Sequence, residues 1–230
     1  MPLKTKVREQ TLGKIDVALT SIFSRSYFPQ FPIDPRTELG HVPRCGHMSY
    51  DQLAAINHCS HRDVVHACRS INGCTTYDPI KKRYMVYINY STCDSLSFRR
   101  IRWTTAHEIG HIVCGHFTEL IEAGAPDVSP SDVKLFDEEA DYFASCLLAP
   151  LPILDFFEMK NPDDIYKHFL LSHPAAQYSM YDLKRYRAGE ISYPPHAENE
   201  LKSCVPTLTT RFHRVSKSDV KKLDDFLYDA

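Results

Sequence analysis

Residues Thr104 to His116 read TTAHEIGHIVCGH. The apolar residues of this stretch recur at helical spacing, and they are Ala106, Ile109, Ile112 and Val113. This pattern predicts a largely buried helix over residues 98–116, with a polar stripe on one face. His107 and His111 lie on that stripe, four residues apart and therefore one helical turn from each other.

The five residues from His107 to His111 have the H-E-x-x-H pattern, in which both imidazoles can reach one metal ion. Histidine nitrogens in this arrangement are typical zinc ligands. Glu108 is turned to the side of the metal, where its carboxylate can take a proton from water and pass it to a leaving amine. The pattern therefore predicts a zinc-dependent peptidase site with His107 and His111 as ligands and Glu108 as the catalytic base.

A catalytic zinc ion needs a third protein ligand and one open position. A histidine six residues after His111 is excluded, because Phe117 stands there and His116 is one residue short. What remains is an acid from a second helix, which the sequence predicts over residues 133–149. The acids that open this helix are Asp137, Glu138, Glu139 and Asp141.

Helical phase separates these four acids. Asp137 and Asp141 lie one turn apart on the apolar face of the predicted helix. We therefore expect Asp137 to be the zinc ligand and Asp141 to hydrogen-bond a ligand histidine. Glu138 is more peripheral but longer, and it stays open as the alternative third ligand. Glu139 is expected to be a solvated carboxylate that the helix dipole favours.

Composition excludes several other classes of protein. The chain has 230 residues, a formal net charge of -2 and 43% apolar residues, so it is long enough for one core and is not built for nucleic-acid binding. The start, Met1-Pro-Leu-Lys, lacks the apolar run of a signal peptide. The eight cysteines are spread over the chain and are expected to be reduced thiols. We expect a cytoplasmic protein with no membrane segment.

The fold class follows from the other periodic segments. Residues 84–90 read YMVYINY and predict a strand, and further helices are expected at 4–24, 50–57, 61–70, 162–172 and 174–187. This indicates an α+β fold, a helix-rich zincin-like domain with a small, mostly antiparallel sheet beside the H-E-x-x-H helix.

Residues 1–189 are expected to form this domain. The site falls within residues 84–150, and the helical C-terminal part covers residues 162–187. Residues 190–230, which end in an amphipathic segment around Val220–Leu227, are expected to be an extension of unknown role.

A Cys/His-dense stretch lies between Cys45 and Cys74. Cys45-Gly-His47 and His58-Cys-Ser-His61 are candidate halves of a second, structural zinc site. Their spacing matches no known finger pattern, so the favoured interpretation is buried cysteines and exposed histidines.

Two segments together resemble the ImmA/IrrE family of metallopeptidases. They are Phe98–His116, which contains T-x-A-H-E-x-G-H, and Glu139–Pro150, which contains E-A-[ND]-x-F-A-x-x-L-L-x-P. The likeness extends over about residues 28–187. Two positions depart from the family pattern: the family's metal-binding Glu is matched by Asp137, one methylene shorter, and Ser179 stands where Arg is frequent.

The resemblance implies a zinc-dependent endopeptidase with Zn²⁺ as its cofactor. It also implies a protein substrate, a helix-turn-helix transcriptional repressor, and hence a role as an anti-repressor in mobile-element or stress regulation. The alternative function is a zinc-containing regulatory module that binds a repressor without cutting it.

Overall fold

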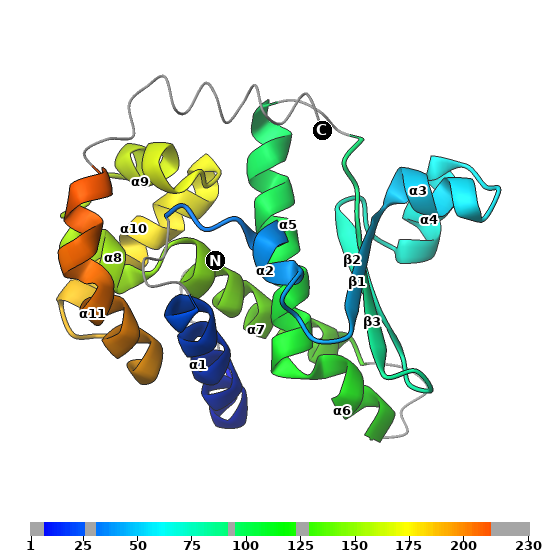
Figure 1. The fold of residues 1–230 in the computed structure, drawn as a ribbon, viewed down its shortest axis with the longest axis horizontal. Coiled ribbons are helices and arrows are strands. Elements are labelled where there is room, and N and C mark those ends of the chain that lie inside the picture. The colour runs from blue at the N-terminus through cyan, green and yellow to red at the C-terminus, as the bar shows by residue number, and fades with distance from the viewer. Residues whose placement is uncertain (1–6, 26–30, 92–94, 123–128, 213–230) are drawn as a thin grey trace.

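The computed structural model describes residues 7–25, 31–91, 95–122 and 129–212 (Figure 1). The helices in these ranges are α1 Glu9–Ser24, α2 Pro35–Leu39, α3 Tyr50–Ile56, α4 His61–Cys68, α5 Ser95–Cys114, α6 His116–Glu122, α7 Pro130–Leu148, α8 Leu151–Phe156, α9 Pro162–Phe169, α10 His173–Arg187 and α11 Pro195–Phe212. The strands are β1 Cys45–Ser49, β2 Gly73–Asp78 and β3 Arg83–Ile88. The predicted α+β class is confirmed.

Helix α5 stands between the sheet and the remaining large helices, as Figure 1 shows. The strands lie in the order β1-β3-β2, with β1 parallel and β2 antiparallel to β3. The sheet is thus mixed, with one pair of each kind, rather than mostly antiparallel. Strand β2 forms one edge of the sheet, and this edge matters for the site described below.

The central strand β3 buries its two faces against different helices. Val86 and Ile88 point toward α5 and belong to the main core. Tyr87 lies on the opposite face, against a small cluster of Tyr50, Ala54 and Val64 from α3 and α4. This alternation is the period of two that a strand imposes on its side chains.

The two short helices behind the sheet begin where the sequence predicts. The Ser49 side chain accepts a hydrogen bond from the Gln52 N–H, and Gln52 Oε1 accepts one from the Ser49 N–H. Ser60 and Asp63 form the same reciprocal pair at the start of α4. Both capping boxes satisfy backbone groups that a helix end otherwise leaves unpaired.

Helices α5 and α7 are in close contact at Gly110. A Cβ atom at this position would lie 2.8 Å from the carbonyl oxygen and 2.9 Å from the Cα of Ala140. Only glycine leaves room for the α7 backbone there. This contact sets how near the H-E-x-x-H face comes to the acids of α7.

We expect Gly110→Ala to destabilise the protein by about 1–2 kcal/mol, because forced overlap in a packed core costs more than the helix propensity that alanine adds. Urea unfolding measures this. Gly13→Ala is the matched control: a Cβ atom at Gly13, in α1, would have no neighbour within 4 Å, so stability is expected to rise by about 0.5–1 kcal/mol. An equal rise at both positions would contradict the close-packing argument.

The C-terminal helix α11 packs against α1 and α8. Its Ala197 and Leu201 are fully buried in the main core. The domain boundary drawn after residue 189 stays a prediction, and the segment Val220–Leu227 lies outside the described residues. In the part of the chain that the structure describes, no helix has the length and apolar character needed to cross a membrane.

Candidate metal centre

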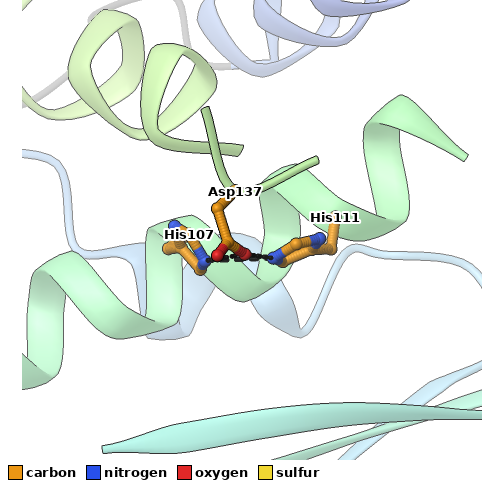
Figure 2. Close-up of side chains that lie close together, drawn as sticks. All are labelled: His107, His111 and Asp137. Carbon is orange, nitrogen blue, oxygen red and sulfur yellow. Dashed lines mark hydrogen bonds and ion pairs between the residues drawn. The ribbon is translucent and has the colours of Figure 1, made fainter. Parts of the chain in front are cut away.

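The side chains of His107, His111 and Asp137 converge between α5 and α7 (Figure 2). The two Nε2 atoms of the histidines lie 3.0 Å apart. Asp137 Oδ1 lies 3.5 Å from His111 Nε2 and 3.9 Å from His107 Nε2. Among the described residues, these three form the one group of ligand atoms close enough to hold a metal ion.

His107 is held from its outer side by Asp141. The His107 Nδ1–H donates to Asp141 Oδ1 at 2.8 Å, and the Trp103 Nε1–H donates to the same oxygen at 3.3 Å. Burial lowers the pKa of His107, but the Asp141 carboxylate outweighs it and raises the pKa above its ordinary value. Asp141 also lines a cavity of about 370 Å³ that Ser179 borders from α10.

His111 is held from its outer side by His116, through a turn that the sequence pattern does not predict. Helix α5 ends at Cys114 because Gly115 adopts a φ of 80°, which favours glycine. The Lys14 ammonium donates to the Cys114 carbonyl at 2.7 Å and so stabilises this helix end. An unbroken helix would place residue 116 about 140° around the axis from residue 111. The turn instead brings His116 Nδ1 to 2.8 Å from His111 Nδ1.

The expectation that Glu139 is solvated is wrong. Its side chain is 0% exposed and accepts from His116 Nε2 at 3.0 Å and from Arg8 through three N–H groups. Burial raises the pKa of the Glu139 carboxyl, but the hydrogen bonds from Arg8 and His116 hold that pKa well below its usual range. Burial in turn lowers the pKa of His116, against the pull of Glu139. The carboxylate is buried because it is paired.

The outer partners of the two histidines determine which atoms the triangle of His107, His111 and Asp137 presents to a metal ion. Because the Nδ1 atoms of His107 and His111 carry their protons outward, both Nε2 atoms present lone pairs inward. The Asp137 carboxylate adds a third acceptor. Three acceptors that converge without a donor call for a cation. Ligands of a tetrahedral zinc ion lie about 3.3 Å apart, close to the three separations seen here.

Glu108 and the three candidate ligands line one pocket. The pocket has a volume of about 450 Å³ and includes the triangle and part of strand β2. Thr75, on β2, donates its hydroxyl proton to Glu108 Oε2 at 2.7 Å. One carboxylate oxygen is therefore held by the sheet edge. Sequence reasoning missed Thr75, since a lone threonine 33 residues before Glu108 gives no pattern.

The remaining candidates lie apart from the triangle. Glu138, the alternative third ligand, pairs with Lys134 at 4.0 Å. Of the Cys/His-dense stretch, Cys59 is exposed and Cys45, Cys68 and Cys74 are half-buried free thiols. These cysteines belong to no group of possible metal ligands within the described residues.

The two site helices present the ligand set that a metallopeptidase needs. Residues 70–181 match the sequence model of the Peptidase_M78 family, described as the IrrE N-terminal-like domain, and this segment belongs to that family. The resemblance noted in the sequence is thereby confirmed, and both site helices fall inside the matched segment. Searches of curated proteins and of solved structures gave no match.

Proposed function

We propose that this protein is a zinc-dependent endopeptidase whose substrate is a helix-turn-helix repressor. The observation that carries the catalytic part is the convergence of two imidazole lone pairs and one carboxylate beside Glu108. The family match supports metallopeptidase chemistry. The repressor as substrate, and with it a cytoplasmic location and an anti-repressor role, extends from the resemblance in the sequence.

Different residues of this chain would bind the metal, transfer the proton and position the catalytic carboxylate. His107, His111 and Asp137 would hold the zinc ion, which supplies Lewis acidity that activates water and polarises a peptide carbonyl. Glu108 takes the proton of the attacking water and delivers it to the amine that leaves. Thr75 keeps the Glu108 carboxylate in place by donating to Oε2, so that Oε1 stays available for that proton.

The position of the edge strand β2 beside the pocket favours an extended peptide as the substrate. Gly73 and Thr75 line the pocket, and β2 has a strand neighbour only on its β3 side within the described sheet. An extended peptide can add to such an edge through main-chain hydrogen bonds, which accept many side chains and fix the scissile bond beside Glu108. A flexible or locally unfolded segment of a protein partner meets this requirement.

Incubation of the purified protein with a helix-turn-helix repressor from the same genome tests the proposal. We expect discrete repressor fragments that appear in the presence of Zn²⁺ and disappear when a chelator is added, because the ligand triangle loses its metal. Electrophoresis and mass spectrometry of the fragments provide the measurement.

Two outcomes contradict the proposal in different ways. Fragments that persist with chelator would exclude a metal-dependent reaction. A stable complex with no fragments, under conditions in which the protein holds one zinc ion per chain, would favour the alternative of a zinc-containing module that binds a repressor without cutting it.

A further inference from the structure

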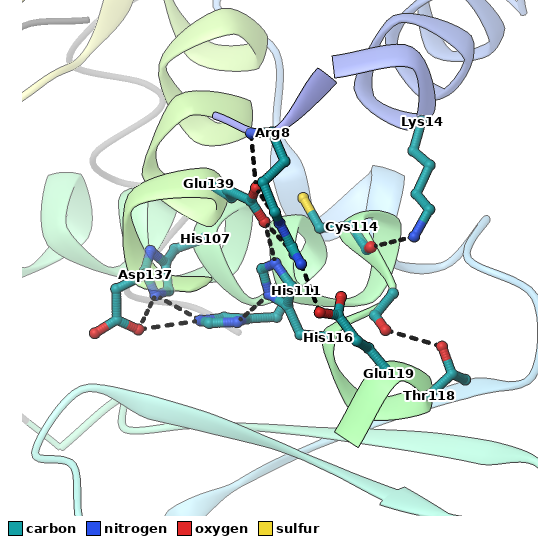
Figure 3. Close-up of polar contacts among 11 residues, drawn as sticks. Arg8, Lys14, His107, His111, Cys114, His116, Thr118, Glu119, Asp137 and Glu139 are labelled. Atoms are coloured by element: carbon teal, nitrogen blue, oxygen red, sulfur yellow. Dashed lines mark hydrogen bonds and ion pairs between the residues drawn. The ribbon is translucent and has the colours of Figure 1, made fainter. Parts of the chain in front are cut away.

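A chain of four side chains runs from the N-terminal segment to the metal triangle (Figure 3). Arg8 binds Glu139 through its backbone N–H at 3.0 Å, its Nε–H at 2.9 Å and its Nη2–H at 2.8 Å. Glu139 Oε2 lies 3.0 Å from His116 Nε2, and His116 Nδ1 lies 2.8 Å from His111 Nδ1. His111 Nε2 then faces the triangle. Each contact has hydrogen-bonding distance, and the two middle groups are buried.

The direction of the hydrogen bonds along this chain is fixed from its Arg8 end. The guanidinium only donates, so both oxygens of Glu139 act as acceptors. His116 must therefore place its proton on Nε2, which leaves Nδ1 as an acceptor. His111 Nδ1–H then donates to His116 Nδ1, so His111 Nε2 carries a lone pair and no proton. Reversal at any one step would turn an N–H of His111 toward the metal position.

We propose that Arg8 and His116 are positioning residues that hold His111 in the ring orientation and tautomer required to bind the metal, and so set the affinity of the site for zinc. The inference rests on the proposed zinc site. Outer partners of ligand histidines fix the ring and its tautomer in metal sites generally, and their loss weakens metal binding by about 10–100-fold. Here the outer partner is a second histidine, backed by a buried ion pair.

Arg8 lies outside the segment that matches the family model, residues 70–181. Arg8 precedes α1 and lies 62 residues before the start of the family segment at residue 70. Its guanidinium also pairs with Glu119 of α6 at 2.5 Å, so it joins α1, α6 and α7 around Glu139. The metal site of the family domain is thus completed from outside that domain, and any displacement of the N-terminal segment changes the support of His111.

Zinc affinity of the full chain tests this, measured by competition between the metal-free protein and a chromophoric chelator. We expect Arg8→Gln to weaken zinc binding by about 10-fold and His116→Leu by about 10–100-fold. His116→Gln keeps an acceptor and a donor in one side chain and is expected to recover about tenfold of the loss in His116→Leu. Arg25→Gln is the matched control, because Arg25 lies at the other end of α1 and pairs with Glu38 at 3.1 Å.

The Co²⁺-loaded forms provide a second measurement, since their visible spectra report the ligand geometry. We expect the spectrum to change in Arg8→Gln and His116→Leu and to remain that of the unmodified protein in Arg25→Gln. Circular dichroism of the metal-free variants confirms that they are folded. If folded Arg8→Gln and His116→Leu bind zinc as tightly as the unmodified protein, the positioning role is excluded while the zinc site stands. If the unmodified protein itself binds no stoichiometric zinc, the proposed function fails as well.

Discussion

Replacing Glu108 with Gln is expected to reduce peptide cleavage by about 1,000-fold and to leave the zinc content unchanged. The carboxamide has nearly the shape of the carboxylate, and it can still accept from the Thr75 hydroxyl through its oxygen. It cannot take a proton from water at neutral pH. The attacking water therefore loses its base and the leaving amine loses its acid, which are the two steps assigned to Glu108.

Two measurements on the same sample decide this prediction. Elemental analysis gives zinc per chain, and the rate at which the repressor disappears gives activity. Glu190→Gln is the control, because Glu190 is an exposed carboxylate that pairs with Arg185 outside the metal centre and carries no proposed role. A Glu108→Gln protein that cleaves at more than about a tenth of the original rate would show that another group moves the proton.

The parts of the fold that the sequence predicts are those with local causes. The caps at Ser49 and Ser60, the buried helix around His107 and the strand near Val86 each depend on residues within one or two turns. Strands β1 and β2 were not predicted, because they contain Gly46 and Gly73 and owe their pairing to β3. The sequence does not predict the short helices α2 and α8, because each has too few residues to show a helical repeat of apolar positions.

The candidate site also contains residues that local sequence patterns predict and residues whose environment depends on distant contacts. The two histidines of the H-E-x-x-H pair are one turn apart, and helical phase predicts Asp137 rather than Glu138 as the third ligand. The structure brings Asp137 close to both histidines. The burial of Glu139 depends on Arg8, 131 residues away, which no local pattern reveals. One signal was present nevertheless. Glu139 aligns along α7 with Phe143 and Cys146, and both are buried, so its own burial followed from the same helical phase that was applied to its neighbours.

Removal of the Asp137 carboxylate is expected to have the largest effect on the metal itself. Asp137→Ala leaves two nitrogen ligands where a catalytic zinc ion has three, and it removes the one anion of the ligand triangle. Zinc affinity is expected to fall by more than about 100-fold, beyond what the loss of an outer partner costs. Cleavage is expected to be lost with the metal, in contrast to Glu108→Gln, in which the metal stays.

The adjacent residue provides the matched control. Glu138→Ala removes a longer carboxylate from the same turn of α7, and that carboxylate pairs with Lys134 rather than with the histidines. We expect its zinc affinity to match that of the unmodified protein in the same chelator competition. The reverse result, tight zinc binding in Asp137→Ala and weak binding in Glu138→Ala, would move the third ligand by one residue. We expect the shorter aspartate to suffice as the third ligand, because its Oδ1 already lies 3.5 Å and 3.9 Å from the two Nε2 atoms, with α7 drawn in against α5 at Gly110.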